Sequence, residues 1–233
     1  MSVINHIIFD LDHTLWDFNR NSRETLEVLF LEHNIENKIN IPYKQFLTQY
    51  YKVTNSLWHL YNKKVISKEE LRLTRLPLVF AKYKYQNEKL FQKMEKQYLA
   101  TCPKKPHLIP GALELLTHLT SHKHTLHLLT NGFKDIQHQK LKASEINQYF
   151  THIVTSECSG YSKPEPKAFL HLLEKIDCQP NECIMIGDNL DTDITGSNKI
   201  GMQNIYFNPE KINHKANPTY EVYTLEEIIT LKF

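Results

Sequence analysis

Strand-like and helix-like segments alternate along the second half of the chain. Apolar, β-branched stretches that predict strands occupy residues 124–131, 151–157, 182–188 and 203–208. Helical patterns alternate with them at residues 111–121, 133–143, 166–176 and 190–199. Strands that alternate with helices of about ten residues are typical of βαβ units, and the right-handed crossover rule then places helices on both faces of a parallel sheet. We therefore predict a doubly wound, Rossmann-like α/β core.

The N-terminal segment "VINHIIFDLDHTLWDF", residues 3–18, predicts a further strand that ends in acid. Its first part is apolar and β-branched, and Asp10 and Asp12 follow one residue apart. A buried strand does not tolerate an unpaired carboxylate in its interior, so we expect both aspartates just beyond the strand's carboxyl end. This pair is a candidate site.

Residues 19 to about 100 interrupt the alternation. Apolar residues recur there at spacings of three and four, as in "FLTQYYKVTNSLWHLY", and no segment predicts a strand. A proline-rich stretch that ends at Gly111 marks the return to the alternating pattern. We predict an α/β core made of residues 1–17 and 102–233, with an all-helical domain, residues 18–101, inserted into it.

The composition is that of an ordinary globular protein. Of 233 residues, 41% are hydrophobic and 23% are charged, and the charges that give a net +2 are scattered rather than gathered in a basic stripe. This pattern argues against nucleic-acid binding. Apolar runs fall short of the ~20 residues of a membrane span and the N-terminus shows no basic leader, so we expect no membrane partner and a cytoplasmic location. The four cysteines form no CxxC pair, which favours free thiols.

Polar side chains gather where the predicted strands end. They are Asp10 and Asp12 after the first strand, Thr130 and Asn131 after the second, and Asp188, Asp191 and Asp193 after the fourth. Ligands of open α/β sheets bind beyond the carboxyl ends of the strands, so we expect these groups to converge. A set of carboxylate oxygens without histidine or cysteine favours Mg²⁺ over zinc.

The same acids would repel an anionic substrate. Two like unit charges ~4 Å apart cost about 4 kcal/mol at an effective dielectric constant of ~20, so a phosphate would need Mg²⁺ and a basic side chain here. Lys163, in "YSKPEPKAF", follows the third strand and fits that need. Thr130, Asn131 and Gly132 open the next helix, where a hydroxyl and free N–H groups can cradle a phosphate. The Asn-Gly pair is equally typical of a simple turn.

Four motifs resemble those of the haloacid dehalogenase superfamily. "DLDHT" resembles its DxDx[TV] motif, "LLTN" its second motif, Lys163 its third and "GDNLDTD" its GDxxxxD fourth motif. They occur in the family's order over essentially the whole chain. The helical insert after the first motif also resembles the C1 cap of subfamily I, a lid over the active site. The resemblance implies the fold of that superfamily and a phosphatase activity.

The resemblance also implies a role for each matching residue. Asp10 would be the nucleophile that forms an aspartyl-phosphate, and Asp12 would protonate the leaving alcohol and then activate water. The phosphoryl group would be held by Thr130, Asn131 and Lys163. Mg²⁺ would be bound by Asp10, the backbone carbonyl of Asp12, Asp188 and Asp193. Simpler roles stay open for Asp193, as an acid at a helix N-terminus, and for Lys163, as a solvated lysine.

Within the superfamily the chain is most similar to the house-cleaning pyrimidine 5'-nucleotidases. The similarity lies in "VTNSLWHLYNKKVISKEELRLTR", "LLTNGFKDIQHQKL" and "NPTYEVYTLEEI". It implies a small phosphomonoester substrate, a nucleoside 5'-monophosphate such as dUMP, dTMP or UMP. Dehalogenases of the superfamily lack the second acid, so Asp12 argues against that chemistry. A sugar phosphomutase, a sugar-phosphate phosphatase and a non-enzymatic binding or regulatory protein remain alternatives, and the oligomeric state is left open.

The insert offers two pairs of side chains that could contact a substrate. Trp58 and Tyr61 share a helix face, as do Arg72 and Arg75, and an aromatic face can stack on a base. An aromatic stripe at helical spacing is also typical of packing. Trp16, close behind the aspartate pair, could touch substrate or brace the hinge.

Overall fold

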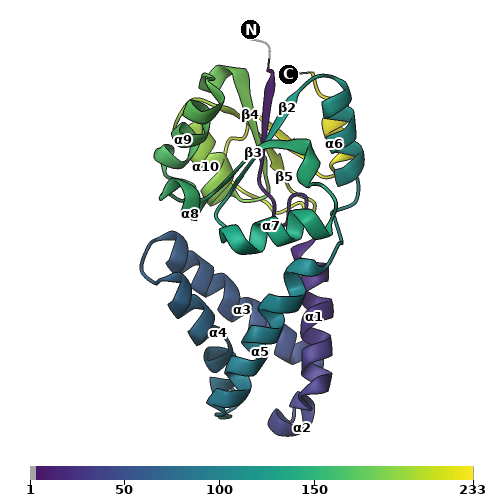
Figure 1. The fold of residues 1–233 in the computed structure, drawn as a ribbon, viewed down its shortest axis with the longest axis vertical. Coiled ribbons are helices and arrows are strands. Elements are labelled where there is room, and N and C mark those ends of the chain that lie inside the picture. Colours follow the sequence, from purple (N-terminus) through teal and green to yellow (C-terminus); the bar gives the residue numbers. More distant parts are fainter. Residues whose placement is uncertain (1–3, 233) are drawn as a thin grey trace. The chain divides into compact units, whose positions relative to one another are not determined.

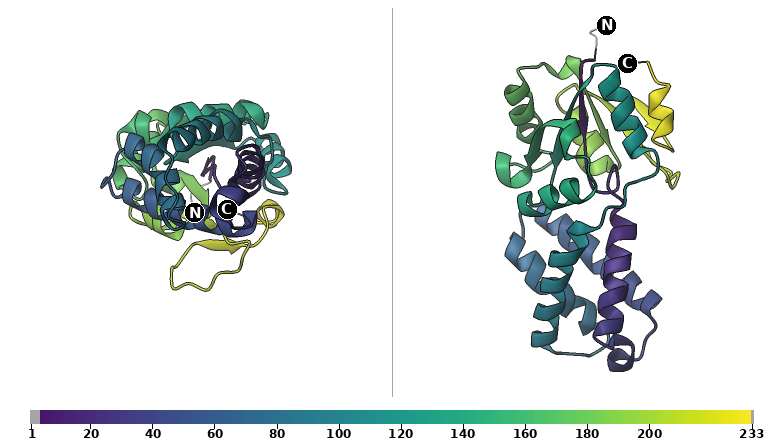
Figure 2. Two further views of the ribbon diagram at one scale, coloured as in Figure 1. Left: turned by 90° about the horizontal axis from the view of Figure 1, so that it is seen from below. Right: turned by 45° about the vertical axis from the view of Figure 1, so that its right-hand side comes forward.

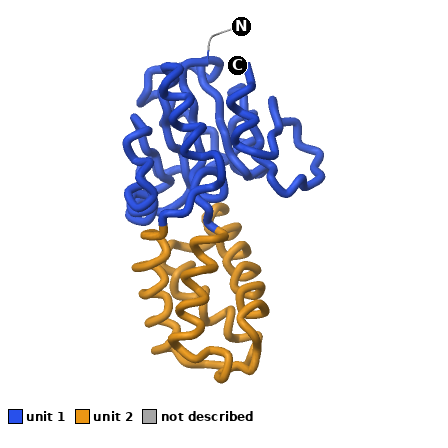
Figure 3. The backbone as a smooth tube through the Cα atoms, turned by 90° about the vertical axis from the view of Figure 1, so that its right-hand side faces the viewer, with its two compact units in different colours: residues 1–18, 106–233 blue, residues 19–105 orange. Residues whose placement is uncertain are grey.

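The computed structural model describes residues 4–232, so the start of the first predicted strand lies outside it. The chain divides into two compact units, residues 1–18 with 106–233 and residues 19–105, which Figure 3 colours separately. No helix within the described part of the chain is both long and apolar enough to cross a membrane. All four cysteines are free thiols, as predicted.

A six-stranded parallel sheet forms the centre of the first unit (Figure 1). Its strands are β1 (His6–Phe9), β2 (Thr125–Thr130), β3 (Phe150–Thr155), β4 (Cys183–Gly187), β5 (Gln203–Phe207) and β6 (Tyr220–Val222). The spatial order is β3-β2-β1-β4-β5-β6, and every neighbouring pair is parallel. At the carboxyl end of β1, Phe9 pairs with Leu128 on one side and with Ile186 on the other. The predicted doubly wound α/β fold is confirmed.

Helices cover both faces of this sheet. They are α6 (Ala112–Ser121), α7 (Lys134–Ala143), α8 (Ser156–Ser159), α9 (Pro166–Ile176), α10 (Thr195–Asn198) and α11 (Glu226–Ile229), with short turns η2 (Asn147–Tyr149), η3 (Pro180–Glu182) and η4 (Leu190–Ile194). On one face, Phe169 and Leu172 of α9 pack against Ile8 and Leu129. Figure 2 shows α6 and α11 on the opposite face, where Leu115 is fully buried. Burial on both faces explains why the strands read as nearly continuous apolar runs.

Three histidines lie side by side on neighbouring strands of this sheet. His6, His127 and His152 come from β1, β2 and β3, and the two-residue side-chain period places them on the face that α9 covers. Nδ1 of His6 lies 3.0 Å from Nε2 of His127, and the rings of His127 and His152 have centroids 5.4 Å apart. The side chain of His127 is 1% exposed, so the middle imidazole is buried among two others.

The sheet order defines where a ligand can bind. After β1 the chain builds β2 and β3 on one side and then β4 and β5 on the other, so the carboxyl ends of β1, β2 and β4 meet at the switch point. The segment after β1 then pairs with the segment that returns from the insert. Trp16 forms an antiparallel bridge with Leu108, and the N–H of Asp17 donates to the carbonyl of His107 at 3.0 Å. The way into the insert and the way out of it are therefore paired within the first unit.

The second unit is helical, and residues 19–105 contain no strand. Its elements are α1 (Phe18–Glu32), α2 (Ile35–Ile39), α3 (Tyr43–Asn62), α4 (Lys68–Ala81), α5 (Glu88–Thr101) and η1 (Cys102–Lys104). Helix α4 begins with a capping box in which Ser67 and Glu70 bind each other's backbone N–H. Aromatic rings fill the core of this unit. The centroid of the Phe80 ring lies 4.8 Å from that of Phe91 and 5.7 Å from that of Phe46.

One of the arginines considered as a substrate contact has a different role. The Arg75 side chain is buried, forms an ion pair with Glu95 and lies 4.9 Å from the ring of Tyr98. Its guanidinium is therefore used inside the helical unit, and the idea that it contacts substrate is abandoned. Trp58 and Tyr61 contact each other edge to face at 5.4 Å and are only half-buried, so packing and substrate contact both stay open for them.

The predicted helical segment at residues 190–199 is found, although not as one regular α-helix. Asn189 caps its start by accepting the N–H groups of Asp191 and Thr192, and the π-helical turn η4 leads directly into α10. The edge strand β6 was not predicted, since three residues show no alternating pattern. It is supported from β5 by Asn204, which exchanges two hydrogen bonds with Thr219.

Candidate active site

Asp10 lies at the carboxyl end of β1, between β2 and β4. Its N–H donates to the carbonyl of Ile186, which continues the ladder with β4 by one residue. Its carboxylate accepts a hydrogen bond of 2.5 Å from the ammonium group of Lys163, whose side chain is 2% exposed. The first predicted acid and the predicted basic residue thus meet, although 153 residues separate them in the sequence.

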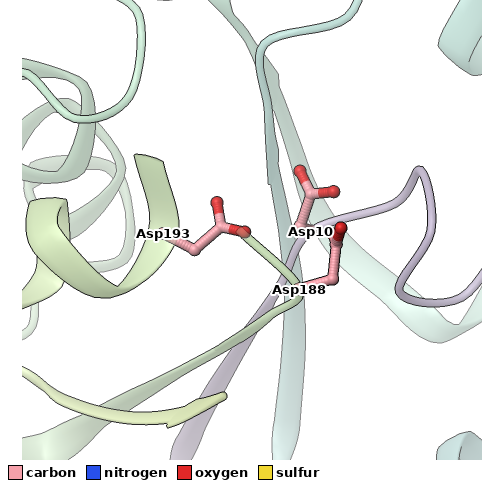
Figure 4. A group of neighbouring side chains, drawn as sticks. All are labelled: Asp10, Asp188 and Asp193. Carbon is pink, nitrogen blue, oxygen red and sulfur yellow. The ribbon is translucent and has the colours of Figure 1, made fainter. Parts of the chain in front are cut away.

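The loop after β4 brings two more carboxylates to the same place. Carboxylate oxygens of Asp10, Asp188 and Asp193 lie within 4.8 Å of one another (Figure 4). Asp193 also accepts from Lys163 at 2.7 Å and from the N–H of Asn189 at 3.1 Å. Gly187 makes this approach possible, because a Cβ there would lie 2.2 Å from a carboxylate oxygen of Asp193.

The charges of this cluster do not balance. Burial raises the pKa of Asp10 to about 7 against the opposing charge of Lys163, and Asp193 adds to the rise. Burial, together with the charges of Asp10 and Asp193, also raises the pKa of Asp188 well above its usual range. A divalent cation would relieve this crowding, and oxygen ligands alone are the set that Mg²⁺ prefers. These residues therefore fit the predicted Mg²⁺ site.

Asp12 is held by a different set of groups. Its carboxylate accepts from the ammonium of Lys140 at 2.6 and 2.8 Å and from Nε2 of Gln137 at 2.9 Å, both on α7. Burial would raise the pKa of Asp12, but the charge and hydrogen bonds of Lys140, aided by Gln137, outweigh burial and lower it. The Asp12 carboxylate is not part of the three-aspartate group, so only its backbone carbonyl remains predicted as a metal ligand.

Lys140 and Gln137 were not predicted from the sequence. Their spacing of three places them on one face of the helix that begins just after the second motif, and that was the available signal. Lys140 is 4% exposed and its ammonium lies 4.5 Å from the centre of the Trp16 ring. Trp16 is itself fully buried, which favours bracing over substrate contact.

The predicted phosphate cradle follows β2. The hydroxyl oxygen of Thr130 accepts from the N–H of Gly132 at 3.1 Å and from Nε2 of Gln137 at 3.0 Å. The Asn131 side chain donates to the carbonyl of Lys163 at 2.9 Å and accepts from its N–H at 2.8 Å. Asn131 therefore holds the loop that carries Lys163, and its direct contact with a phosphate stays a prediction.

Fold and motifs together define a family. Residues 4–201 match the haloacid dehalogenase-like hydrolase family, and the chain belongs to it. Pyrimidine 5'-nucleotidase PynA of Streptococcus pneumoniae is 31% identical over 226 residues, which cover 96% of this chain and 92% of that protein. Pyrimidine 5'-nucleotidase YjjG of Escherichia coli is 27% identical and covers 95% of each chain. A crystal structure of HAD-hydrolase YfnB from Bacillus subtilis, bound to magnesium, superposes with a TM-score of 0.86 at 28% identity over 97% of each chain. The chain is thus a phosphatase of this hydrolase family.

Proposed function

We propose that this chain is a Mg²⁺-dependent phosphomonoesterase that works through an aspartyl-phosphate on Asp10 and acts on pyrimidine nucleoside 5'-monophosphates. The observation that carries the proposal is the convergence of Asp10, Asp188 and Asp193 with one buried ammonium group, that of Lys163, at the switch point of the sheet. The similarity to the pyrimidine 5'-nucleotidases PynA and YjjG supports the choice of substrate class.

The first half of the reaction would transfer the phosphoryl group to the protein. A carboxylate oxygen of Asp10 attacks the phosphorus atom, the ester P–O bond breaks, and Asp12 gives a proton to the leaving alcohol. Lys163 and Thr130 would hold the phosphoryl oxygens by charge and by hydrogen bonding. Mg²⁺, held by Asp10, Asp188, Asp193 and the carbonyl of Asp12, would supply positive charge that offsets the phosphate and the carboxylates.

The second half would return the protein to its starting state. Asp12 takes a proton from a water molecule as the water attacks phosphorus, the bond between Asp10 and phosphorus breaks, and inorganic phosphate leaves. The lowered pKa of Asp12 suits this step and opposes the first, because a base must be ionised before it can accept a proton and an acid must hold the proton that it gives. The contacts from Lys140 and Gln137 hold its carboxylate in one place for both steps.

The unit of residues 19–105 follows the catalytic aspartates directly in the chain. We propose that it is the cap that selects the substrate, with Trp58 and Tyr61 as candidates for contact with the base. Their edge-to-face pair leaves both rings only half-buried.

Phosphate release from a panel of monophosphates tests the proposal. We expect turnover of dUMP, dTMP and UMP in the presence of Mg²⁺ and weaker turnover of purine nucleotides and sugar phosphates. Preference for a sugar phosphate would overturn the assignment of the substrate class but not that of a phosphatase activity. Isomerised sugar phosphate without free phosphate, in the presence of a bisphosphate activator, would identify a mutase instead.

A further inference from the structure

We propose that Gln137 is a positioning residue that fixes the direction of the Thr130 hydroxyl and ties it to the Asp12 carboxylate. The inference rests on the proposed function, which assigns Thr130 to the phosphoryl group and Asp12 to the leaving oxygen. Gln137 touches neither the phosphoryl group nor the leaving oxygen in that assignment. It acts through the two residues that do.

The side-chain nitrogen of Gln137 lies between two acceptors. Nε2 is 2.9 Å from a carboxylate oxygen of Asp12 and 3.0 Å from the hydroxyl oxygen of Thr130. A primary amide nitrogen carries two hydrogens, so both bonds form at once. The neighbouring ammonium of Lys140 favours an ionised Asp12, and a carboxylate would repel the amide oxygen in this place. The nitrogen therefore faces the site, and the side chain is 0% exposed.

Two donors fill the acceptor capacity of Thr130. A hydroxyl oxygen has two lone pairs and one hydrogen. The N–H of Gly132, at 3.1 Å, uses one lone pair, and Nε2 of Gln137 uses the other. Only the O–H hydrogen is left for a third partner, so Thr130 must act as a donor. Phosphoryl oxygens are acceptors, and the hydroxyl is therefore set in advance for the group it is assigned to hold.

Gly132 is needed for the space that Gln137 occupies. A Cβ at position 132 would lie 1.7 Å from Nε2 and 2.4 Å from Cδ of Gln137. The backbone of Gly132 does not lie in the left-handed region, so an alanine could adopt its conformation. The variant Gly132→Ala thus displaces the Gln137 side chain without changing residue 137, which gives a second and independent perturbation.

Binding of inorganic phosphate in the presence of Mg²⁺ tests the inference by calorimetry. We expect Gln137→Met and Thr130→Val each to weaken binding roughly tenfold, as for the loss of one hydrogen bond. The double variant should bind no more weakly than Thr130→Val alone, because Gln137 acts through that hydroxyl. In turnover of the best monophosphate, kcat should fall in Gln137→Met by a similar factor.

The outcomes separate this inference from the proposed function. Wild-type affinity in Gln137→Met, or losses that simply add in the double variant, would overturn the role of Gln137 while phosphatase activity stands. The proposed function alone would be overturned if the wild-type protein binds phosphate and the variants show the expected coupling, but no monophosphate is hydrolysed. Wild-type protein that binds no phosphate would overturn both.

Controls guard against a folding effect. The control Gln139→Met replaces another glutamine of α7, whose side-chain amide donates to the carbonyl of Asp135. This variant should bind phosphate like the wild type. Gly132→Ala should reproduce the binding loss of Gln137→Met, and it decides the matter if Gln137→Met does not fold. Gly132→Ala with full phosphate affinity would contradict the inference.

Discussion

Substitution of His127 should remove a defined part of the pH dependence of stability. Burial, and after it the charges of His6 and His152, lower the pKa of His127 from 6.5 to about 3. The unfolded chain therefore binds a proton between these values that the folded chain does not, and stability is lost as pH falls below 6.5. Between pH 7.5 and pH 5.0 this one group should cost about 2 kcal/mol of the free energy of unfolding.

Urea unfolding of the wild type and of His127→Leu at the two pH values measures this cost. Between pH 7.5 and 5.0 the free energy of unfolding of the wild type should fall by about 2 kcal/mol more than that of the variant. Altered packing in the variant lowers its stability equally at both pH values and does not affect this difference. Groups far from residue 127 titrate in both proteins and cancel in the comparison, so that the difference reports His127 together with its neighbours His6 and His152. His138→Gln, at an exposed position on α7, should keep the wild-type dependence. Equal losses in the wild type and in His127→Leu would refute the reasoning.

Four further predictions concern the site and the helical unit. Asp10→Asn should lower phosphate release at least about a thousandfold, with an equal or higher thermal midpoint because one of the crowded carboxylates is neutral; activity near that of the wild type would remove the nucleophile assignment. Chelation should abolish turnover and added Mg²⁺ should restore it, so activity that persists in excess chelator would count against the metal. Lys140→Met should lower kcat about tenfold and move the acid limb of the pH profile of activity to higher pH, since loss of the ammonium raises the pKa of Asp12. The control Lys142→Met, on the exposed side of α7, should change neither kcat nor the pH profile. Arg75→Met should destabilise the protein by about 3–5 kcal/mol in urea unfolding by leaving a buried carboxylate unpaired, and a loss below about 1 kcal/mol would contradict this.

The sequence was sufficient for the fold and for the residues at the strand ends. Parallel strands place their carboxyl ends at one edge, so acids that follow separate strands had to converge once the alternation was recognised. Asp10, Asp188 and Asp193 could be grouped from the sequence for this reason. Their roles in catalysis stay predictions.

Contacts made by helix α7 could not be predicted in the same way. A lysine and a glutamine on a helix are usually solvated, and no local pattern says which face of α7 turns toward the loop after β1. Lys140 and Gln137 became part of the site only because that loop folds back and brings Asp12 to the helix. The two-way bond between Asn131 and Lys163 was missed for the same reason, since it joins two loops 32 residues apart.

The paired segments around Trp16 and Leu108 have a consequence for how such proteins diversify. The segments that enter and leave the helical insert are hydrogen-bonded to each other. A shorter, longer or unrelated domain could therefore be inserted there without disturbing the strand ends that carry the chemistry. Selectivity can then evolve by exchange of a module, while the reaction itself is inherited unchanged.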